Sequence, residues 1–285
     1  MNTLQISRWT VKEAARRRLL LGLILLSSVF VGLFGLGFVL LYNKVRASSG
    51  ADAFAGTLAA NILTVLGLYA VQFLAAFLAL FLSVGAISAD VDSGTLHAVL
   101  ARPVSRSQYL LGRWLAFAGL LVAYVLSMAG ALLLIARVVA GYEPVSPLRT
   151  LALLTLEVLF LVSVGMLGST VLPTLGNGVL TFSLFGLAWL GGIIEFIGST
   201  VHNVGMANVG TGVALAFPSD ALWRGASYFA QSPAFLAQTS AVGQVSGGIP
   251  FASAAPPTVA IVAWALGYLL VVQILARAAF ARRDL

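Results

Sequence analysis

Residues 19–42 read LLLGLILLSSVFVGLFGLGFVLLY and contain no charged side chain. The hydrocarbon core of a bilayer is about 30 Å thick, and a helix needs roughly 20 apolar residues to cross it. This stretch therefore predicts a membrane-spanning helix. A removable signal peptide is the alternative interpretation, but the apolar core of a signal peptide is usually about 7–15 residues long. We therefore expect the helix to be retained.

Five further apolar runs follow the first one, at about residues 58–87, 114–136, 151–172, 179–198 and 258–276. The composition agrees with this pattern: 60% of the 285 residues are hydrophobic and 9% are charged, whereas about a quarter are charged in a soluble globular protein. The mean hydropathy is +1.02. We predict an all-α polytopic membrane protein with six transmembrane helices, in which residues 1–285 form a single transmembrane domain.

Lysine and arginine lie mainly at the ends of these runs and give the chain a net charge of +7. If the N-terminus is inside, eleven of the sixteen basic residues fall on the cytoplasmic side and five on the outer side. Because basic residues favour the cytoplasmic side, we predict a multi-pass protein with both termini in the cytoplasm. We expect it in the cytoplasmic (inner) membrane of a bacterium or archaeon.

Residues 2–18 precede the first span and carry Arg8, Lys12 and Arg16 at intervals of about one helical turn. This spacing predicts an amphipathic helix that lies on the anionic lipids of the inner leaflet. Membrane lipid is therefore an expected partner. A basic flank to the first span, without an interfacial helix, is the alternative.

Residues 199–257 form a long outer segment in which Asp220 and Arg224 are the sole charges. So apolar a segment is expected to dip into the membrane or to cap it. A helix start with an acidic first turn predicts a short helix over about residues 219–230. We expect Leu222 and Trp223 to face lipid or a partner, and Asp220 to pair with Arg224 on the wet side. Asp220, Trp223 and Arg224 are thus the candidates for an external cap.

Ionisable residues within or near the spans are the next candidates, because a charge in hydrocarbon is costly. Glu157 lies about two turns into the fourth span, and Glu195 lies near the outer end of the fifth. With Arg137 and Gln72 they are candidates for a conduit or gate, with a role in gating or in binding a cationic group. The alternative is structural: Glu157 pairs with an arginine, Arg137 or Arg149, Glu195 reaches the interface, and Gln72 makes an interhelical hydrogen bond.

The sequence lacks the motifs of several kinds of enzyme. It contains no cysteine, and neither of its two lysines, Lys12 and Lys44, follows a glycine as the lysine of a P-loop does. Its two histidines, His97 and His202, are not spaced as metal ligands on a helix. We therefore expect no catalytic residue, no metal site and no cofactor bound by this chain. The scattered basic residues also give no reason to expect nucleic acid.

Residues 88–113 form the one substantial cytoplasmic loop. Leu96, Val99 and Leu100 share one helical edge, and Pro103 ends that helix. Ser105 followed by Gln108 predicts a capping box for the next helix. A short amphipathic helix between two spans suits contact with another protein. An ordinary charged connector is the alternative.

This loop resembles the signature of ABC transporter type 2 permeases, the membrane subunits of ATP-driven, exporter-like transporters. In the signature, acidic residues precede Gly-Thr-Leu, an apolar pair follows, and Pro-Val-Ser-Arg ends the motif. The matching residues are Asp90, Asp92, Gly94, Thr95, Leu96, Val99, Leu100, Pro103, Val104, Ser105 and Arg106. Six spans, an amphipathic N-terminus and the long segment before the last span extend the resemblance over most of the chain.

The resemblance implies that residues 90–106 include a coupling helix held by a separate ABC ATPase. Such a permease works as a dimer with two ATPase subunits, so a second copy of the chain is an expected partner. ATP and Mg would bind in the ATPase, and the chain would not be an enzyme by itself. This agrees with the absence of a P-loop.

Two other functions stay open at this stage. The chain could be a membrane scaffold or maturation factor that transmits ATPase motion to a protein partner. It could also be a secondary transporter, but such proteins have interrupted helices around an ion site at the membrane midplane. In this sequence the acids of the spans lie toward one face.

Overall fold

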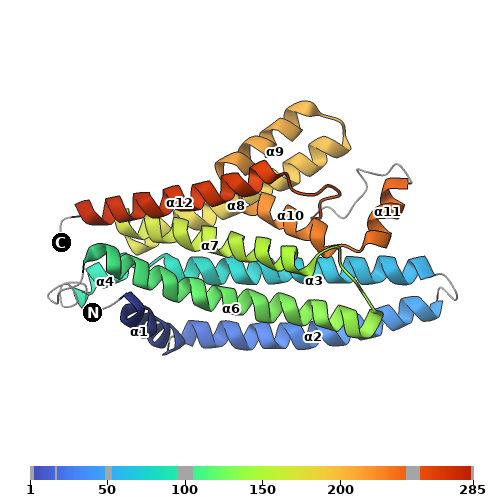
Figure 1. Cartoon of the computed structure of the whole chain (residues 1–285), viewed down its shortest axis with the longest axis horizontal. Coiled ribbons are helices and arrows are strands. Elements are labelled where there is room, and N and C mark those ends of the chain that lie inside the picture. Colours follow the sequence, from blue (N-terminus) through green and yellow to red (C-terminus); the bar gives the residue numbers. More distant parts are fainter. Residues whose placement is uncertain (1–2, 17, 49–52, 96–104, 242–250, 284–285) are drawn as a thin grey trace.

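The computed structural model describes residues 3–16, 18–48, 53–95, 105–241 and 251–283. Within these ranges, six helices are long and apolar enough to cross a membrane, which confirms the predicted all-α polytopic fold. They are α2 (Arg18–Ser48), α3 (Ala53–Ser83), α6 (Arg106–Ala140), α7 (Pro147–Val171), α8 (Thr174–Thr200) and α12 (Val259–Arg282). They form an elongated bundle with both ends of the chain at the same end of it (Figure 1).

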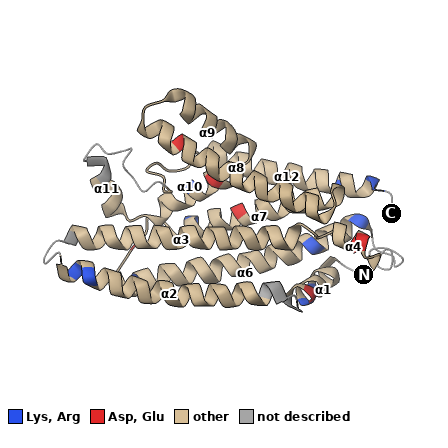
Figure 2. Cartoon of the chain, turned by 180° about the vertical axis from the view of Figure 1, so that it is seen from behind, with Lys and Arg blue, Asp and Glu red and all other residues tan. Residues whose placement is uncertain are grey.

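The spans differ in how deeply they are enclosed. In α3 and α7, 61% and 56% of the most apolar window is buried, against 11% in α2 and 17% in α12. The centre of the bundle is thus built on α3 and α7, with α2 and α12 at its periphery. Lysine and arginine lie largely at the two ends, and the long middle section is almost free of them (Figure 2).

Two helix boundaries differ from the predicted ones for identifiable reasons. The third span begins at Arg106 instead of residue 114, because Ser105 and Gln108 form the predicted capping box. The second span ends at Ser83 instead of residue 87, and a turn then leads into α4 (Ser88–Asp92). The backbone N–H groups of Ile87 and Ser88 both donate to Ser169 Oγ, at 2.8 and 3.0 Å. They therefore leave the hydrogen-bond ladder of the helix.

The predicted N-terminal helix is present as α1 (Thr3–Arg16). It packs against α6, and Ile6 is buried in that contact, while Trp9 is about half exposed. The basic stripe predicted on this helix includes Arg16, whose side chain lies outside the described part of the structure. The helix therefore belongs to the bundle and is not only a flank of the first span.

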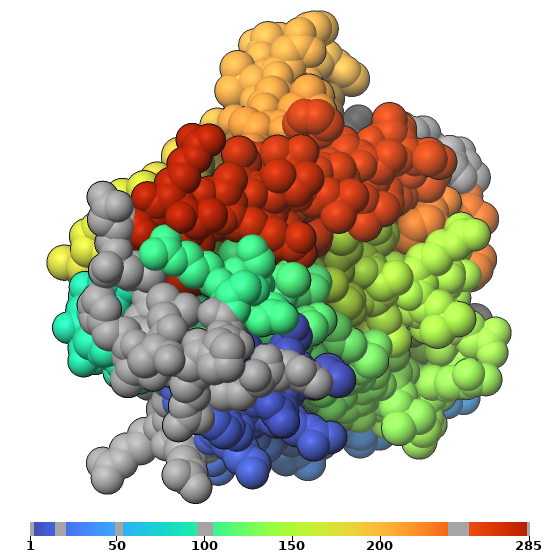
Figure 3. All heavy atoms as spheres, turned by 60° about the vertical axis from the view of Figure 1, so that its left-hand side comes forward, coloured from blue at the N-terminus to red at the C-terminus, as the bar shows by residue number. Residues whose placement is uncertain are grey.

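The described part of the segment that was predicted to lie outside contains three short helices, α9 (Val204–Ala216), α10 (Ser219–Ala230) and α11 (Pro233–Ala241). Asn203 caps α9 by accepting a hydrogen bond from the N–H of Met206 at 3.1 Å. The α8–α9 pair forms a hairpin, and α9 stands out from the body of the molecule (Figure 3). Its exposed side chains are largely apolar, with Val204, Val209 and Leu215 among them.

The α8–α9 hairpin depends on close helix contact at Gly210. A Cβ atom on Gly210 would lie 2.3 Å from Glu195 Cβ and 2.7 Å from Gly191 O. A Cβ atom on Gly212 would instead point into open space. We expect Gly210→Val to force the helices apart and to lower the free energy of unfolding by about 1–3 kcal/mol. Gly212→Val on the same helix is the matched control, and thermal unfolding in detergent measures both. Equal destabilisation by the two variants would contradict this packing.

The structure confirms the predicted bounds of α10 but corrects its orientation. Leu222 and Trp223 are each about 1% exposed and face the core, not lipid or a partner. Trp223 Nε1 donates to Phe251 O at 2.6 Å. Because α10 packs on α7, α3 and α8, its apolar side is used inside the chain.

Candidate functional site

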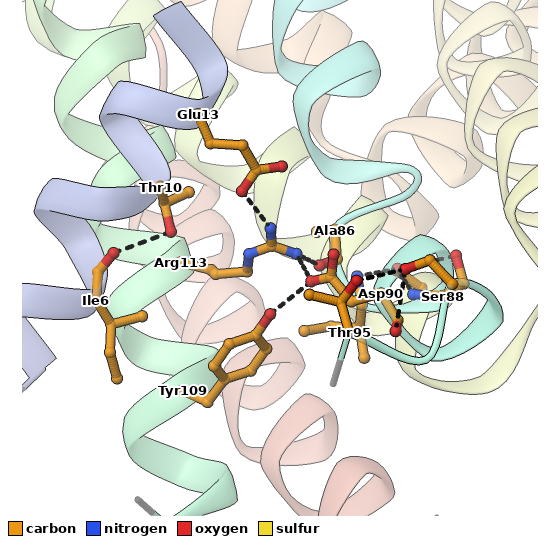
Figure 4. A network of polar contacts seen from close by, with 12 residues as sticks. Ile6, Thr10, Glu13, Ala86, Ser88, Asp90, Thr95, Tyr109 and Arg113 are labelled. Carbon is orange, nitrogen blue, oxygen red and sulfur yellow. Dashed lines mark hydrogen bonds and ion pairs between the residues drawn. The ribbon is translucent and has the colours of Figure 1, made fainter. Parts of the chain in front are cut away.

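Arg113 joins three elements at the loop end of the bundle. From α6, its guanidinium donates to the carboxylate of Asp90 on α4 and to the carbonyl of Ala86, and its Nη2 lies 2.9 Å from Glu13 Oε2 on α1 (Figure 4). Tyr109, one turn earlier on α6, donates its hydroxyl to the same Asp90 carboxylate. The Arg113 side chain is only 4% exposed. These contacts tie α1 and α4 to α6.

A buried arginine requires this arrangement, since an unpaired charge in a protein interior is strongly destabilising. Asp90 is 14% exposed and Glu13 is 46% exposed, so Asp90 provides most of the buried compensation. Beside the network lies a cavity of about 540 Å³, whose lining includes Trp9, Thr95 and Tyr109. The contacts of Arg113 with Asp90 and Glu13 therefore hold the start of the loop between α4 and α6 in a defined place.

The residues of the predicted coupling motif divide into two groups. Asp90 points inward to Arg113. Asp92, Gly94 and Thr95 are exposed and are near the end of the described part of the loop; we call these three residues the loop tip. Gly94 has a φ of 70°, in the left-handed region that glycine tolerates. The predicted helix residues Leu96, Val99, Leu100 and Pro103 lie outside the described residues.

Arg106, the last residue of the motif, binds the end of another helix. Its Nη1 donates to the carbonyls of Phe280, Ala281 and Arg283, at 3.2, 3.0 and 2.7 Å. The last carbonyls of a helix have no partner within the helix, and a basic side chain can satisfy them. Arg106 therefore caps α12 and attaches it to the start of α6.

Two further contacts close a ring at this end of the bundle. Arg283 Nη1 donates to the carbonyls of Ser169 and Thr170 at the end of α7, at 3.2 and 3.0 Å. Ser169 Oγ accepts hydrogen bonds from the N–H groups of Ile87 and Ser88 at the start of α4. Asp90 on α4 then contacts Arg113 on α6. We call this closed path, from α6 through α12, α7 and α4 back to α6, the polar ring. Four helices are thus joined by hydrogen bonds at the end of the bundle where the loop begins.

The turn between α3 and α4 is also hydrogen-bonded to the turn between α7 and α8. Ser88 Oγ lies 2.8 Å from Thr174 Oγ1 at the start of α8. Asn177 Nδ2 donates to the carbonyl of Val84 at 2.7 Å and to that of Gly165 at 2.8 Å. The α3–α4 turn is thereby fixed to the α7–α8 turn, and α8 is coupled to the same unit.

In the membrane-spanning part, Glu157 on α7 pairs with Gln72 on α3. Gln72 Nε2 donates to Glu157 Oε1 at 2.8 Å, and both side chains are buried. The alternative of a Glu157–arginine pair is wrong. Arg137 instead lies 3.9 Å from Glu143 at the exposed end of α6, and Arg149 lies over the ring of Phe229.

Three further candidates lie together, because Asp220 and Glu195 both contact Arg224. Its Nε lies 2.9 Å from Asp220 Oδ2, as predicted from their spacing on α10, and its Nη1 lies 3.3 Å from Glu195 Oε2 on α8. Asp220 is 12% exposed and Arg224 is 25% exposed, so the pair is not on the wet side. Burial raises the pKa of Asp220 to about 6, although Arg224 lowers it. This cluster connects the α8–α9 hairpin to α10.

These features define a polytopic helical membrane protein in which the loop between α4 and α6 is joined to the spans by the polar ring. A sequence model of the family described as "ABC-2 family transporter protein" matches residues 9–285. The chain therefore belongs to the ABC-2 family and is an ABC-2 type permease. Membership implies association with an ABC ATPase component. A comparison with curated proteins found no match.

Proposed function

We propose that the chain is the permease subunit of a transporter driven by ATP hydrolysis in a separate ABC ATPase. The observation that carries this proposal is the polar ring behind an exposed loop tip. Asp92, Gly94 and Thr95 are free of the packing that holds Asp90, so a partner can contact them. The ATPase would bind ATP and Mg, and this chain would contribute no catalytic group.

Transmission of force follows from the connections of the loop. When the ATPase closes on nucleotide, it displaces the loop tip, and Arg113 and Arg106 carry the displacement into α6 and α12. Ser169 and Arg283 carry it into α7. Since packed helices move as rigid bodies, the outer parts of these helices would change their spacing. Two copies of the chain with two ATPase subunits would enclose the conduit between them.

Reconstitution tests this function against the alternatives. The chain is co-expressed with a candidate ABC ATPase from the same genome, purified through a tag on the chain, and placed in liposomes. We expect a stable complex that hydrolyses ATP and moves a solute. A complex that hydrolyses ATP and binds a protein partner but moves no solute would favour the scaffold. Solute transport without any ATPase would favour a secondary transporter.

The orientation of the chain in the membrane has its own test. Both termini and α4 lie at one end of the bundle (Figure 1). We propose that this end is cytoplasmic. Ser107 lies at this end and Glu143 at the other, and both are exposed. The chain has no cysteine, so Ser107→Cys and Glu143→Cys each give a single labelling site. An impermeant thiol reagent added to intact cells is expected to label only Glu143→Cys. Labelling of Ser107→Cys alone would reverse the proposed orientation.

A further inference from the structure

The Glu157–Gln72 contact leaves two buried oxygen atoms without a hydrogen-bond donor. Glu157 is 1% exposed and Gln72 is 4% exposed. Gln72 Nε2 donates to Glu157 Oε1, but Gln72 Oε1 and Glu157 Oε2 have no partner among the described residues. A buried polar atom without a partner costs about 1–3 kcal/mol. Two such atoms in a single side-chain pair therefore call for an explanation.

Both oxygen atoms, Gln72 Oε1 and Glu157 Oε2, lack a hydrogen-bond donor when Glu157 is ionised. A glutamine oxygen only accepts hydrogen bonds, and an ionised carboxylate also only accepts them. If Glu157 is ionised, both atoms are acceptors and neither can satisfy the other. A single proton on Glu157 Oε2 turns that atom into a donor, and Gln72 Oε1 is the acceptor left over on its partner. One proton would give Glu157 Oε2 a hydrogen to donate and would offer Gln72 Oε1 a donor.

The charged surroundings of Glu157 do not replace that proton. Arg224 is already shared by Asp220 and Glu195, and Arg137 and Arg149 have the contacts described above. The charge that acts on Glu157 from α10 is the carboxylate of Asp220, which has the same sign as an ionised Glu157. From α3, besides Gln72, Tyr69 is close enough to interact electrostatically with Glu157. These neighbours supply no positive partner.

We propose that Glu157 is a proton-binding site. In this conformation it carries one proton and forms a neutral acid–amide pair with Gln72, in which each side chain donates one hydrogen bond and accepts one. The pair joins α3 to α7 in the centre of the bundle without placing a net charge there. This proposal does not rest on the proposed transport function. It replaces the expectation that Glu157 offers a negative charge to a cationic group.

Infrared spectroscopy of the purified full chain in detergent tests the protonation state directly. At about pH 8, well above the pKa of about 6 of Asp220, we expect a carbonyl-stretching band of a protonated carboxyl group that is present in the wild type and lost in Glu157→Gln. Glu195→Gln is the matched control, because the carboxylate of Glu195 faces Arg224, and this variant is expected to keep the band. Absence of the band from the wild type, or its persistence in Glu157→Gln, would overturn the proposal.

Thermal unfolding provides a second measurement that needs no spectral assignment. A glutamine at position 157 donates an N–H where the protonated acid donates its O–H, so Glu157→Gln is expected to unfold within about 2 °C of the wild type. Gln72→Met leaves the acid without its partner and is expected to unfold about 4 °C lower or more. If Glu157→Gln is destabilised as much as Gln72→Met, the carboxylate is required in its ionised form. Stabilisation of the wild type alone by sodium or potassium ions would instead assign the site to a metal cation. Either result would overturn the proposal.

Discussion

Replacing Arg113 by methionine is expected to lower the free energy of unfolding by about 3–5 kcal/mol, the usual cost of removing one partner from a buried ion pair. Asp90 would keep its contact with the hydroxyl of Tyr109 but lose its contact with the Arg113 guanidinium, and its side chain is only 14% exposed. Glu13 would lose its contact with Arg113, and α1 would lose a polar tie to α6. Thermal unfolding in detergent is expected to shift downward by about 10 °C.

Arg137→Met is the matched control for this prediction. Arg137 lies on the same helix, and it too faces a glutamate, but the two atoms are 3.9 Å apart and both side chains are more than 70% exposed. Exposed ion pairs contribute about 0–1 kcal/mol. The control is therefore expected to unfold close to the wild-type temperature. Equal shifts in the two variants would mean that Arg113 acts as a surface charge, contrary to the buried network.

A double variant separates the charge of Arg113 from its packing. Asp90→Asn removes the buried carboxylate that Arg113 compensates. Added to Arg113→Met, it is expected to recover part of the lost stability, because the double variant contains neither the guanidinium nor the carboxylate that the guanidinium faced. Strict additivity of the two single effects would show that the two side chains are not coupled.

Replacing Gly94 by valine is expected to reduce the amount of ABC ATPase that co-purifies with the chain by about tenfold or more. With a φ of 70°, a residue with a β-carbon at this position costs about 1–2 kcal/mol. The exposed tip can avoid that cost only by changing the direction in which the chain enters the loop. A loss of about 1.4 kcal/mol in binding free energy lowers affinity tenfold.

Gly141→Val controls for backbone strain alone. Gly141 follows the last residue of α6 and has a φ of 62°. A β-carbon added at position 141, like one added at position 94, would point into open space. It lies at the opposite end of the bundle from Gly94. Gly141→Val is expected to keep the ATPase. Loss of the ATPase from both variants would indicate a general folding defect, and retention in both would contradict contact between the ATPase and the loop tip.

The number and approximate places of the spans could be predicted from the sequence because a bilayer imposes a length on an apolar helix. The start of α6 needed one more signal, the capping box at Ser105 and Gln108. Its side chains reach only three residues, so the pattern is visible locally. The bounds of α10 were predictable for the same reason, from an acidic first turn after Pro218.

The facing of α10 was not predictable by the same means. In a soluble protein an apolar face points to the core, but in a membrane protein both core and lipid accept an apolar side chain. Trp223 therefore fitted either environment, and the packing of α10 on α7 decides for the core. The partner of Glu157 was missed for a related reason. Its depth along α7 matched that of an arginine, but only the rotation of the helix determines which neighbour it meets.

Arg113, one of the eleven basic residues expected on the cytoplasmic side, also shows from its position in the sequence that it needs a partner. An arginine eight positions into a span that begins at Arg106 has to be compensated. The sequence offers Asp90 and Glu13 as acids on the same side of the membrane. The assignment of Asp90 to Arg113 requires the turn at residues 84–87, and that turn depends on Ser169, more than eighty residues away.

The three acceptors of Arg106 are main-chain carbonyls. The attachment of α12 to α6 therefore depends on where the backbone at the end of α12 lies, and not on which side chains it carries. Substitutions at Ala281 leave the acceptors in place. A single inserted or deleted residue within α12 would instead rotate its end by about 100° and shift it by about 1.5 Å. The carbonyls would then point away from Arg106. The number of residues in the last helix is thus under a stricter constraint than its composition at that end.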